Sequence, residues 1–595
     1  MRSLNKKSEQ ECSRDSHDKQ CKNFSKLKPS RGRIFDNRSG GPASKFQFRT
    51  QPVTVVKNTS GSGYLCLEKF LHCLLYALPL CLFLSYHPVI KLGESETMYF
   101  ELSVAEIWLV VFDVVAVAEL VRRKKLFDGL RQRRWWMWLL FPVWATLSVV
   151  WSLNMTRGVL TAGMMWLVVL AGYAMWGLKD ELNARFWEAW WKWFFGATLF
   201  VCGWCVVQCV LDLAGVGQEY SLMCDGCTYR MFGFPHPNGF AIEPQFMGNL
   251  LLAPTIVVAW LLLRGNCNSA LRGRGSSRPS LRGSDPSSLG RNLRKPLRTL
   301  LSVASWKSTA TSSHSLCSCF LLLCLFAVAT TLFLTFSRGA IYAFVVGMLF
   351  MSGFMVFGAK KRERSGLWKR MGLTWSVVGL AFVMALNLQG LMAEVGPTDD
   401  TYFDGVTKVV NHLSLGVIDL KGDDAVREME KNENTEGELV DDRFEVVEKP
   451  VENFEENSGK EEAIFDGYVA ESTDTRVRLS GAALSVWSQN PRNALLGVGL
   501  GGAGQALYNN GLSPAPREIV QNEYASLLLE TGLIGVSLFA LMITLVLRVV
   551  WEKPARMMVL SLLVSYGISL MFFSGLPNAL HVCLFPLVLV FSLSY

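Results

Sequence analysis

Charged residues are scarce in this chain of 595 residues: 18% are Asp, Glu, Lys or Arg, against about 25% in soluble domains. Hydrophobic residues make up 50%, and they fall in blocks near 20 residues long, which is the length that spans a bilayer. A series of soluble domains is therefore excluded. The 50 glycines follow no collagen repeat, no heptad persists, and the recurring apolar blocks exclude a wholly disordered chain.

The 15 cysteines form no disulfide framework, because most lie inside apolar runs, where a thiol behaves as a small hydrophobe. Cys224 and Cys227 are the exception, in the polar stretch MCDGCTYR. A CxxC pair of this kind binds metal, cycles between redox states or closes a small disulfide. With no second CxxC and no histidine pair nearby, we expect no metal site. The redox and disulfide alternatives stay open.

The apolar blocks predict an all-α polytopic membrane protein with about 12 transmembrane helices, because lipid offers no partners to unpaired backbone groups. We place the spans near residues 67–90, 103–121, 135–152, 158–177, 194–214, 240–263, 316–336, 339–358, 371–393, 523–548, 556–575 and 578–594. Every second loop then carries basic runs, such as RRKKLFDGLRQRR at 122–134. The positive-inside rule puts these loops and both termini in the cytoplasm, so the net charge of +9 predicts no nucleic-acid binding.

The same reasoning divides the chain into six regions. They are a disordered basic cytoplasmic tail at 1–63, transmembrane helices 1 to 6 at 64–263, a basic low-complexity cytoplasmic loop at 264–315, helices 7 to 9 at 316–393, a large extracytoplasmic loop at 394–522 before the tenth helix, and helices 10 to 12 at 523–595. Within the large loop, we expect the acidic part 420–471 to be disordered and 472–522 to be folded and helical.

Arginines at the membrane edge are candidates for a functional site, since inserting a charge costs at least ~2.5 kcal/mol. Arg338 lies in TFSRGAIYAF, Arg230 in YRMFGFPHPNGFAIEPQ, and Arg476 and Arg478 lie in DTRVRLSGAALSVWSQNP. The predicted topology puts all four on the extracytoplasmic face. A single arginine there is commonly an interfacial anchor. A group of them suits a phosphate or pyrophosphate, which the guanidinium fork binds with two hydrogen bonds.

Two further stretches carry polar or glycine-rich patterns. Gly499 and Gly501 lie in NPRNALLGVGLGGAGQALYN, where backbone N–H groups can bind an anion, although the pattern also fits a tight turn or close helix packing. No strand precedes it and no Gly-Lys-Ser/Thr follows, so nucleotide binding is not expected. Gln521, Asn522 and Glu523 lead into the tenth span.

These motifs, in their order, resemble the O-antigen ligase and O-antigen polymerase family of bacterial envelope proteins. The order is RMFGFPHPNGFA, SRGAIYAFVVG, RVRLSGAALSVWSQNPRNALLGVGLGG and QNEYASLLLETGLIG, with the large outer loop before the tenth span, and it covers roughly 230–550. Each motif is weak alone, but the order and spacing are fairly specific.

The resemblance implies a metal-independent glycosyltransferase of the bacterial inner membrane, without a cofactor, that acts in the synthesis of surface polysaccharide such as lipopolysaccharide. Such an enzyme takes a glycan from an undecaprenyl-pyrophosphate carrier and joins it to a hydroxyl of a glycan or lipid acceptor on the extracytoplasmic face. Membrane lipids would surround it.

The resemblance also implies roles for single residues. Arg338, Arg230 and either Arg476 or Arg478 would bind the pyrophosphate and stabilise charge on the leaving group. The remaining expected substrate-binding residues are His236, Asn238, Glu243, Asn522, Gly499 and Gly501.

Gln521 departs from the family pattern. Ligases of the family usually have histidine there, proposed as the base that takes the acceptor's proton, and a glutamine amide has no suitable pKa. Glu523 or Glu243 then takes this role, or His236 does, or the protein is a polymerase-like relative or has lost activity. Two readings from other classes are a transporter or flippase of an anionic lipid-linked glycan and a non-catalytic scaffold. The edge position of the arginines, without an internal repeat, favours transfer.

Overall fold

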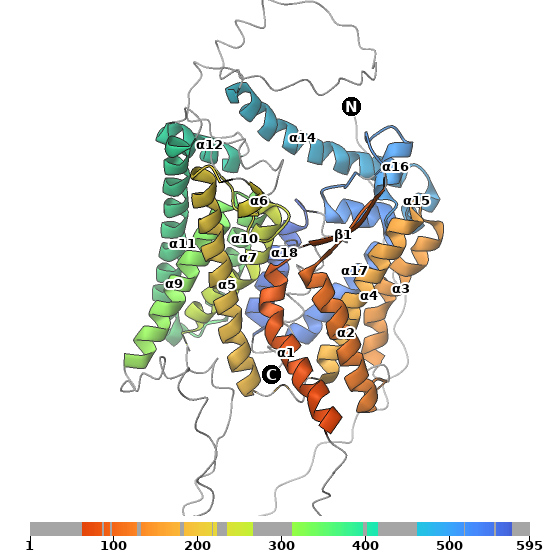
Figure 1. Cartoon of the computed structure of the whole chain (residues 1–595), viewed down its shortest axis with the longest axis horizontal. Helices are drawn as coiled ribbons and strands as arrows, with labels where there is room; N and C mark the ends of the chain where they lie inside the picture. The colour runs from red at the N-terminus through yellow and green to blue at the C-terminus, as the bar shows by residue number, and fades with distance from the viewer. Residues whose placement is uncertain are drawn as a thin grey trace, which may run out of the picture. The chain divides into compact units, whose positions relative to one another are not determined.

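In a computed structural model of the chain, the described helices and strands begin at Ser62 (Figure 1). The described residues are 62–85, 89–95, 98–127, 133–178, 182, 184–216, 218–222, 235–265, 312–396, 401–414, 461–516, 518–551 and 555–573. Outside them lie Arg230, Cys224 and Cys227, as well as the predicted tail, most of the basic loop, most of the acidic stretch and the twelfth predicted span.

The described chain is mostly helical, as predicted. Its elements are α1 (Ser62–Phe83), β1 (Val89–Ser95), β2 (Met98–Ser103), α2 (Val104–Arg122), α3 (Arg133–Ser148), η1 (Val149–Trp151), α4 (Met155–Leu178), α5 (Ala184–Leu213), α6 (Gln218–Ser221), α7 (Pro244–Arg264), α9 (Ser312–Leu334), α10 (Arg338–Gly358), α11 (Lys361–Val395), α12 (Tyr402–Ser414), α14 (Glu461–Ser488), α15 (Pro491–Leu496), α16 (Ala503–Asn509), α17 (Glu523–Trp551) and α18 (Arg556–Ser569). A helix overlaps each of the first eleven predicted spans, although α1 ends at Phe83 and α18 at Ser569, short of the predicted ends at 90 and 575.

Six of the described helices are long and apolar enough to cross a bilayer by length and composition. They are α4, the part Phe186–Leu213 of α5, α7, α10, α11 and α17, and shorter apolar helices run over Trp136–Trp151, Ser318–Leu334 and Arg556–Ser569. The apolar helices indicate a membrane-embedded protein. Six of the expected spans are thus supported by length and composition, and the total of twelve stays a prediction.

Helix α7 lies at the centre of a group of the described helices. In its apolar stretch 83% of the residues are buried inside the protein, against 11% in α17. Helices α9, α10, α11 and α18 pack around α7, and the main apolar core joins them to α1, α2 and α5. Because a residue on α7 can move little, the loop that leads into it is firmly placed.

Among the described residues, the structure departs from an all-α fold at one place. Strands β1 and β2 form an antiparallel hairpin, with Val89 opposite Ser103 and Ser95 opposite Met98. The hairpin occupies the predicted loop between the first two spans and also takes in Val89 and Ile90, which we placed at the end of the first span. Antiparallel strands can be joined by a two-residue connection. Strands this short contain too few apolar residues to be recognised in the sequence beside the flanking spans.

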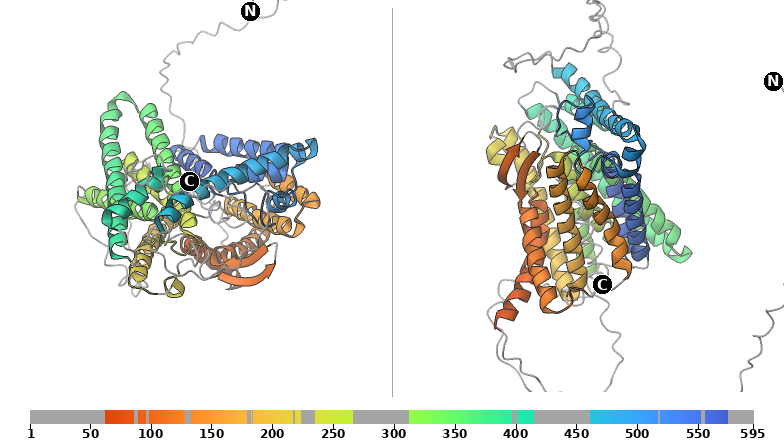
Figure 2. Two further views of the ribbon diagram at one scale, coloured as in Figure 1. Left: turned by 90° about the horizontal axis from the view of Figure 1, so that it is seen from above. Right: turned by 90° about the vertical axis from the view of Figure 1, so that its right-hand side faces the viewer.

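The predicted folded half of the large loop begins earlier than expected. Helix α14 starts at Glu461, before the boundary at 472 that the change in composition indicated. It packs on α15, α16 and α17, and the views in Figures 1 and 2 show it running across the end of the helices where α12 and α16 also lie. Acidic composition is therefore a poor guide to where this helix begins.

A glycine loop at 497–502 fills a break in α17. At Gly532 the helix has φ 65° and ψ −173°, so carbonyl groups before it lose their helical partners. The N–H groups of Val498 and Gly499 donate to the carbonyl oxygens of Leu529 and Glu530, both at 2.9 Å. The indole of Trp144 donates to the next carbonyl oxygen, of Thr531, at 3.0 Å. The break is thus satisfied by protein, as a membrane helix requires.

Two glycines at this junction leave no room for a side chain. Gly497 has φ 75° and ψ 179°, a conformation that other residues rarely adopt. A Cβ on Gly497 would meet the Glu530 carbonyl, and one on Gly532 would meet the Leu495 carbonyl. The sequence left a tight turn and close packing open as alternatives to an anion-binding loop, and these contacts favour close packing.

We expect Gly497→Ala and Gly532→Ala each to lower the free energy of unfolding by about 2 kcal/mol or more, because strain and collision add. Gly481→Ala in α14 is the matched control, since a Cβ there meets nothing within 4 Å. It should be neutral or stabilising by up to ~1 kcal/mol. Thermal unfolding of the detergent-solubilised protein measures both effects, and equal melting temperatures for all three variants would contradict the close packing.

Candidate functional site

Arg476 lies where three segments distant in sequence meet. Its Nε donates to Oε1 of Gln521 at 2.8 Å, and its Nη2 to Oε1 of Gln245 at 3.4 Å. Gln245, in the first turn of α7, donates in turn to the carbonyl oxygen of Phe572 at 2.7 Å. Two neutral amide oxygens therefore orient the guanidinium.

Arg338 is buried, with 7% of its surface exposed, at the first position of α10. Its charge interacts with His412 of α12, and so does the charge of Arg476. Two of the four predicted arginines thus act on one imidazole. The convergence of guanidinium groups at one site stays a prediction, and the shared interaction with His412 supports it.

The N-termini of α7, α10 and α17 meet at these arginines. Ser337 caps α10 by accepting from the N–H of Ala340 at 3.4 Å, and Asn522 caps α17 by accepting from the N–H groups of Tyr524 and Ala525 at 3.1 and 3.2 Å. A Cβ on Gly248 of α7 would touch the side chains of Ser337 and Ala340, so α7 and α10 start close together. Helix N-termini carry partial positive charge and attract anions.

Glu243 supplies a carboxylate beside this positive charge, at the residue before α7. Its side chain reaches the surface, yet the surrounding protein desolvates the carboxylate and raises its pKa, while Arg476 lowers it in part. A carboxylate with a raised pKa is a stronger base than an ordinary one near neutral pH. Of the bases suggested by the sequence, Glu243 has the environment that fits this role.

His236 is fully enclosed and stacks against Phe336, just before Arg338. Burial lowers the pKa of His236 to about 3, and the pKa of His412 lies well below 6.5 because of burial and of the charges of Arg338 and Arg476. Both imidazoles are therefore neutral at physiological pH. A group with such a low pKa is a weak base, which argues against His236 as the proton acceptor.

Asn238 is part of the framework behind the site. Its amide donates to the carbonyl oxygen of Ala241 at 2.6 Å and accepts from Nε2 of Gln208 at 3.2 Å. Gln208, buried in α5, also accepts from the N–H of Gly239 at 2.8 Å. The interactions of Asn238 thus hold the loop before α7, whereas substrate binding was expected.

Three further predicted residues are Arg478, Glu523 and Arg230. Arg478 is exposed two positions beyond Arg476 on α14, so it points to another side of the helix. Glu523 is half-buried in the first turn of α17, and its N–H donates to the carbonyl oxygen of Leu570 at 3.0 Å. Arg230 lies outside the described residues.

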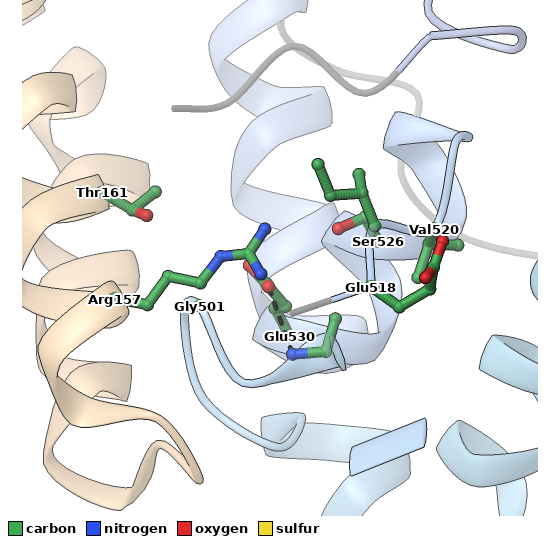
Figure 3. Close-up of a pocket in the computed structure, with 9 residues that line it drawn as sticks. Arg157, Thr161, Gly501, Glu518, Val520, Ser526 and Glu530 are labelled. Carbon is green, nitrogen blue, oxygen red and sulfur yellow. Dashed lines mark hydrogen bonds between the residues drawn. The ribbon is translucent and has the colours of Figure 1, made fainter. Parts of the chain in front are cut away.

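A small pocket lies beside Gly501 (Figure 3). The guanidinium of Arg157, at the start of α4, points toward the carboxylate of Glu530, which accepts from the N–H of Ala503 at 3.3 Å. A Cβ on Gly501 would meet the backbone at Gly158, just as one on Gly499 would meet Ser152. These contacts show both glycines packed against other backbone, with Gly501 also lining the pocket.

Residues 322–540 match a family model described as O-Antigen ligase. The match assigns this part of the chain to the O-antigen ligase family. It includes Arg338, Arg476 and Gln521 and confirms the resemblance drawn from the motifs. No curated protein matches the sequence.

The sequence does not single out three residues of this candidate site. Gln245 follows Glu243 and Pro244, where α7 starts. Its only signal in the sequence is that it lies about one helical turn after the motif RMFGFPHPNGFA. His412 lies on the polar side of an amphipathic pattern, YFDGVTKVVNHLS, and nothing local links it to Arg338. Phe336 precedes the SRG motif and looks like the end of an apolar span. Their importance arises from contacts between distant segments.

We expect the stability of the protein to fall as the pH drops from about 6.5 toward 3. The unfolded histidines titrate near 6.5 but His236 in the folded protein titrates at about 3, so the unfolded chain gains protons first. This imidazole alone should cost about 1 to 2 kcal/mol of stability between about pH 6.5 and 5. His236→Phe, which keeps an aromatic ring, should lose less stability over that interval. Equal losses in both proteins, measured by thermal unfolding, would contradict a neutral buried imidazole.

Proposed function

We propose that the protein transfers a glycan from an undecaprenyl-pyrophosphate carrier to a hydroxyl of a glycan or lipid acceptor at the extracytoplasmic face of the inner membrane. One observation carries the proposal: Arg338 and Arg476 act on one place at the N-termini of three helices. Such a concentration of positive charge suits a diphosphate. The family of residues 322–540 supports lipid-linked glycan and acceptor as the general substrates.

In the proposed reaction the acceptor oxygen attacks the anomeric carbon of the donor sugar. The bond between that carbon and the phosphate oxygen breaks, and undecaprenyl pyrophosphate leaves with the electron pair. Arg338 and Arg476 stabilise the charge that develops on the leaving oxygen. The proton of the acceptor hydroxyl passes to the carboxylate of Glu243, because Gln521 cannot take it.

We expect Arg338→Ala and Arg476→Ala each to lower glycan transfer about 100-fold or more, the usual cost of losing a donor to a developing anion. Arg478→Ala is the matched control, since Arg478 is exposed two positions farther along the same helix. Membrane insertion should be normal in all three. Surface glycan and lipid-linked precursor from cells carrying each variant give the measurement. Wild-type glycan in both site variants would refute the proposed enzyme.

Deletion of the protein should leave long glycan chains on the lipid carrier, because the matching family model is described as a ligase. Loss of a polymerase would instead leave single repeat units on the carrier. Gel separation of the lipid-linked pool by length distinguishes the two, with the complemented strain as control. Single units would keep the transferase chemistry but assign it to chain elongation.

A further inference from the structure

Phe336 has an unusual backbone for its side chain. It lies in the two-residue turn between α9 and the cap of α10, with φ at 58°, in the left-handed region that L residues avoid. Its N–H donates to the carbonyl oxygen of Phe333 at 3.2 Å, which closes the turn. Ser337 and Arg338 follow directly, so the direction in which α10 starts, and with it the position of Arg338, depends on this turn.

Two histidine rings stack against the ring of Phe336, and all three side chains are buried. The ring centroids of His236 and Phe336 are 4.7 Å apart with the planes at 28°, and those of Phe336 and His412 are 4.5 Å apart with the planes at 13°. The exposed fractions are 2% for His236, 5% for Phe336 and 6% for His412. Both stacks have the near-parallel geometry of favourable ring contacts.

The two histidines come from separate parts of the chain. His236 belongs to the loop that the Gln208 and Asn238 network fixes ahead of α7, whereas His412 belongs to α12 in the large loop. The imidazole of His412 also hydrogen-bonds the backbone of Phe336. The hydroxyl of Tyr342, one turn into α10 from Arg338, donates to the carbonyl oxygen of Leu413. Helix α12 is therefore attached on both sides of Arg338.

We propose that the stack of His236, Phe336 and His412 is a positioning device for Arg338: the two imidazoles hold the strained Phe336 turn and so aim the guanidinium at the pyrophosphate. The inference rests on the proposed glycan transfer. His236 and His412 are then positioning residues, which act through the arginine and touch no reacting atom.

Ring shape, rather than proton transfer, is what this device needs, because the imidazoles are neutral beside the charges of Arg338 and Arg476. A phenyl ring provides the same flat apolar surface; at position 412 it also removes the hydrogen bond to the Phe336 backbone, so position 236 tests ring shape alone. Phenylalanine should therefore replace either histidine, whereas alanine should release the turn. A catalytic histidine would behave differently, since neither replacement could carry a proton.

The experiment compares His412→Ala with His412→Phe and His236→Ala with His236→Phe in the full-length protein. Initial transfer rates are measured at varied concentrations of undecaprenyl-pyrophosphate-linked glycan extracted from the host. The alanine variants should lose kcat by about 10- to 100-fold, as misplacement of a binding group does. The phenylalanine variants should stay within about threefold of the wild type. His72→Ala is the matched control, since His72 contacts Phe186 elsewhere in the fold, 5.6 Å between centroids.

Each outcome decides the proposal. Alanine variants as active as His72→Ala would overturn it, and so would folded phenylalanine variants as inactive as the alanine ones, which would assign proton transfer to the histidine. If the alanine variants fail to accumulate, the phenylalanine variants still decide, because the proposal requires their activity. Arg338→Ala keeps the two hypotheses apart: an active Arg338→Ala refutes the transferase, while an inactive one with active His412→Ala refutes only the positioning device.

Discussion

The positive charges of buried Arg338 and half-buried Arg476 both act on His412, so the protein must keep two like charges oriented around one imidazole. Gln245 and Gln521 offer Arg476 neutral acceptors, and the nearby imidazoles are uncharged. These partners fix the direction of the guanidinium, and the Glu243 carboxylate interacts with its charge. In the proposed reaction, an incoming diphosphate binds at this positive charge, and the two guanidinium groups stabilise the negative charge that grows as the sugar leaves.

Helices α14, α15 and α16 pack on α17 and form one structure with it. Gly497 and Gly532 bring the glycine loop into the break in α17, and the loop's N–H groups replace the partners that the break removes. The same helix begins at Asn522, beside the glutamine that orients Arg476. A shift of the glycine loop would therefore reach Gln521 along about three helical turns. The glycines contribute to the site through packing, at a distance from the proposed substrate.

The sequence predicted those features that depend on a strong local cost. Apolar length located the helices, and the cost of a charge at the membrane edge drew attention to Arg338 and Arg476. It missed His412 and Gln245, whose roles come from segments that meet only after folding. The hairpin at Val89–Ser103 and the early start of α14 at Glu461 were missed for another reason: short strands and an acidic helix resemble loops in composition.

Gln521 takes on a different meaning in this geometry. Its carbonyl oxygen is committed to Arg476, so the position that carries histidine in many ligases here orients the guanidinium, and the base must be another group. Glu243 feels both desolvation, which raises its pKa, and Arg476, which lowers it. In the proposed reaction the donor's diphosphate attracts that same guanidinium and adds negative charge beside the carboxylate. Both effects raise the pKa of Glu243 further. Glu243 would thus become a stronger base when the donor is bound, which couples proton removal to the presence of a sugar to transfer.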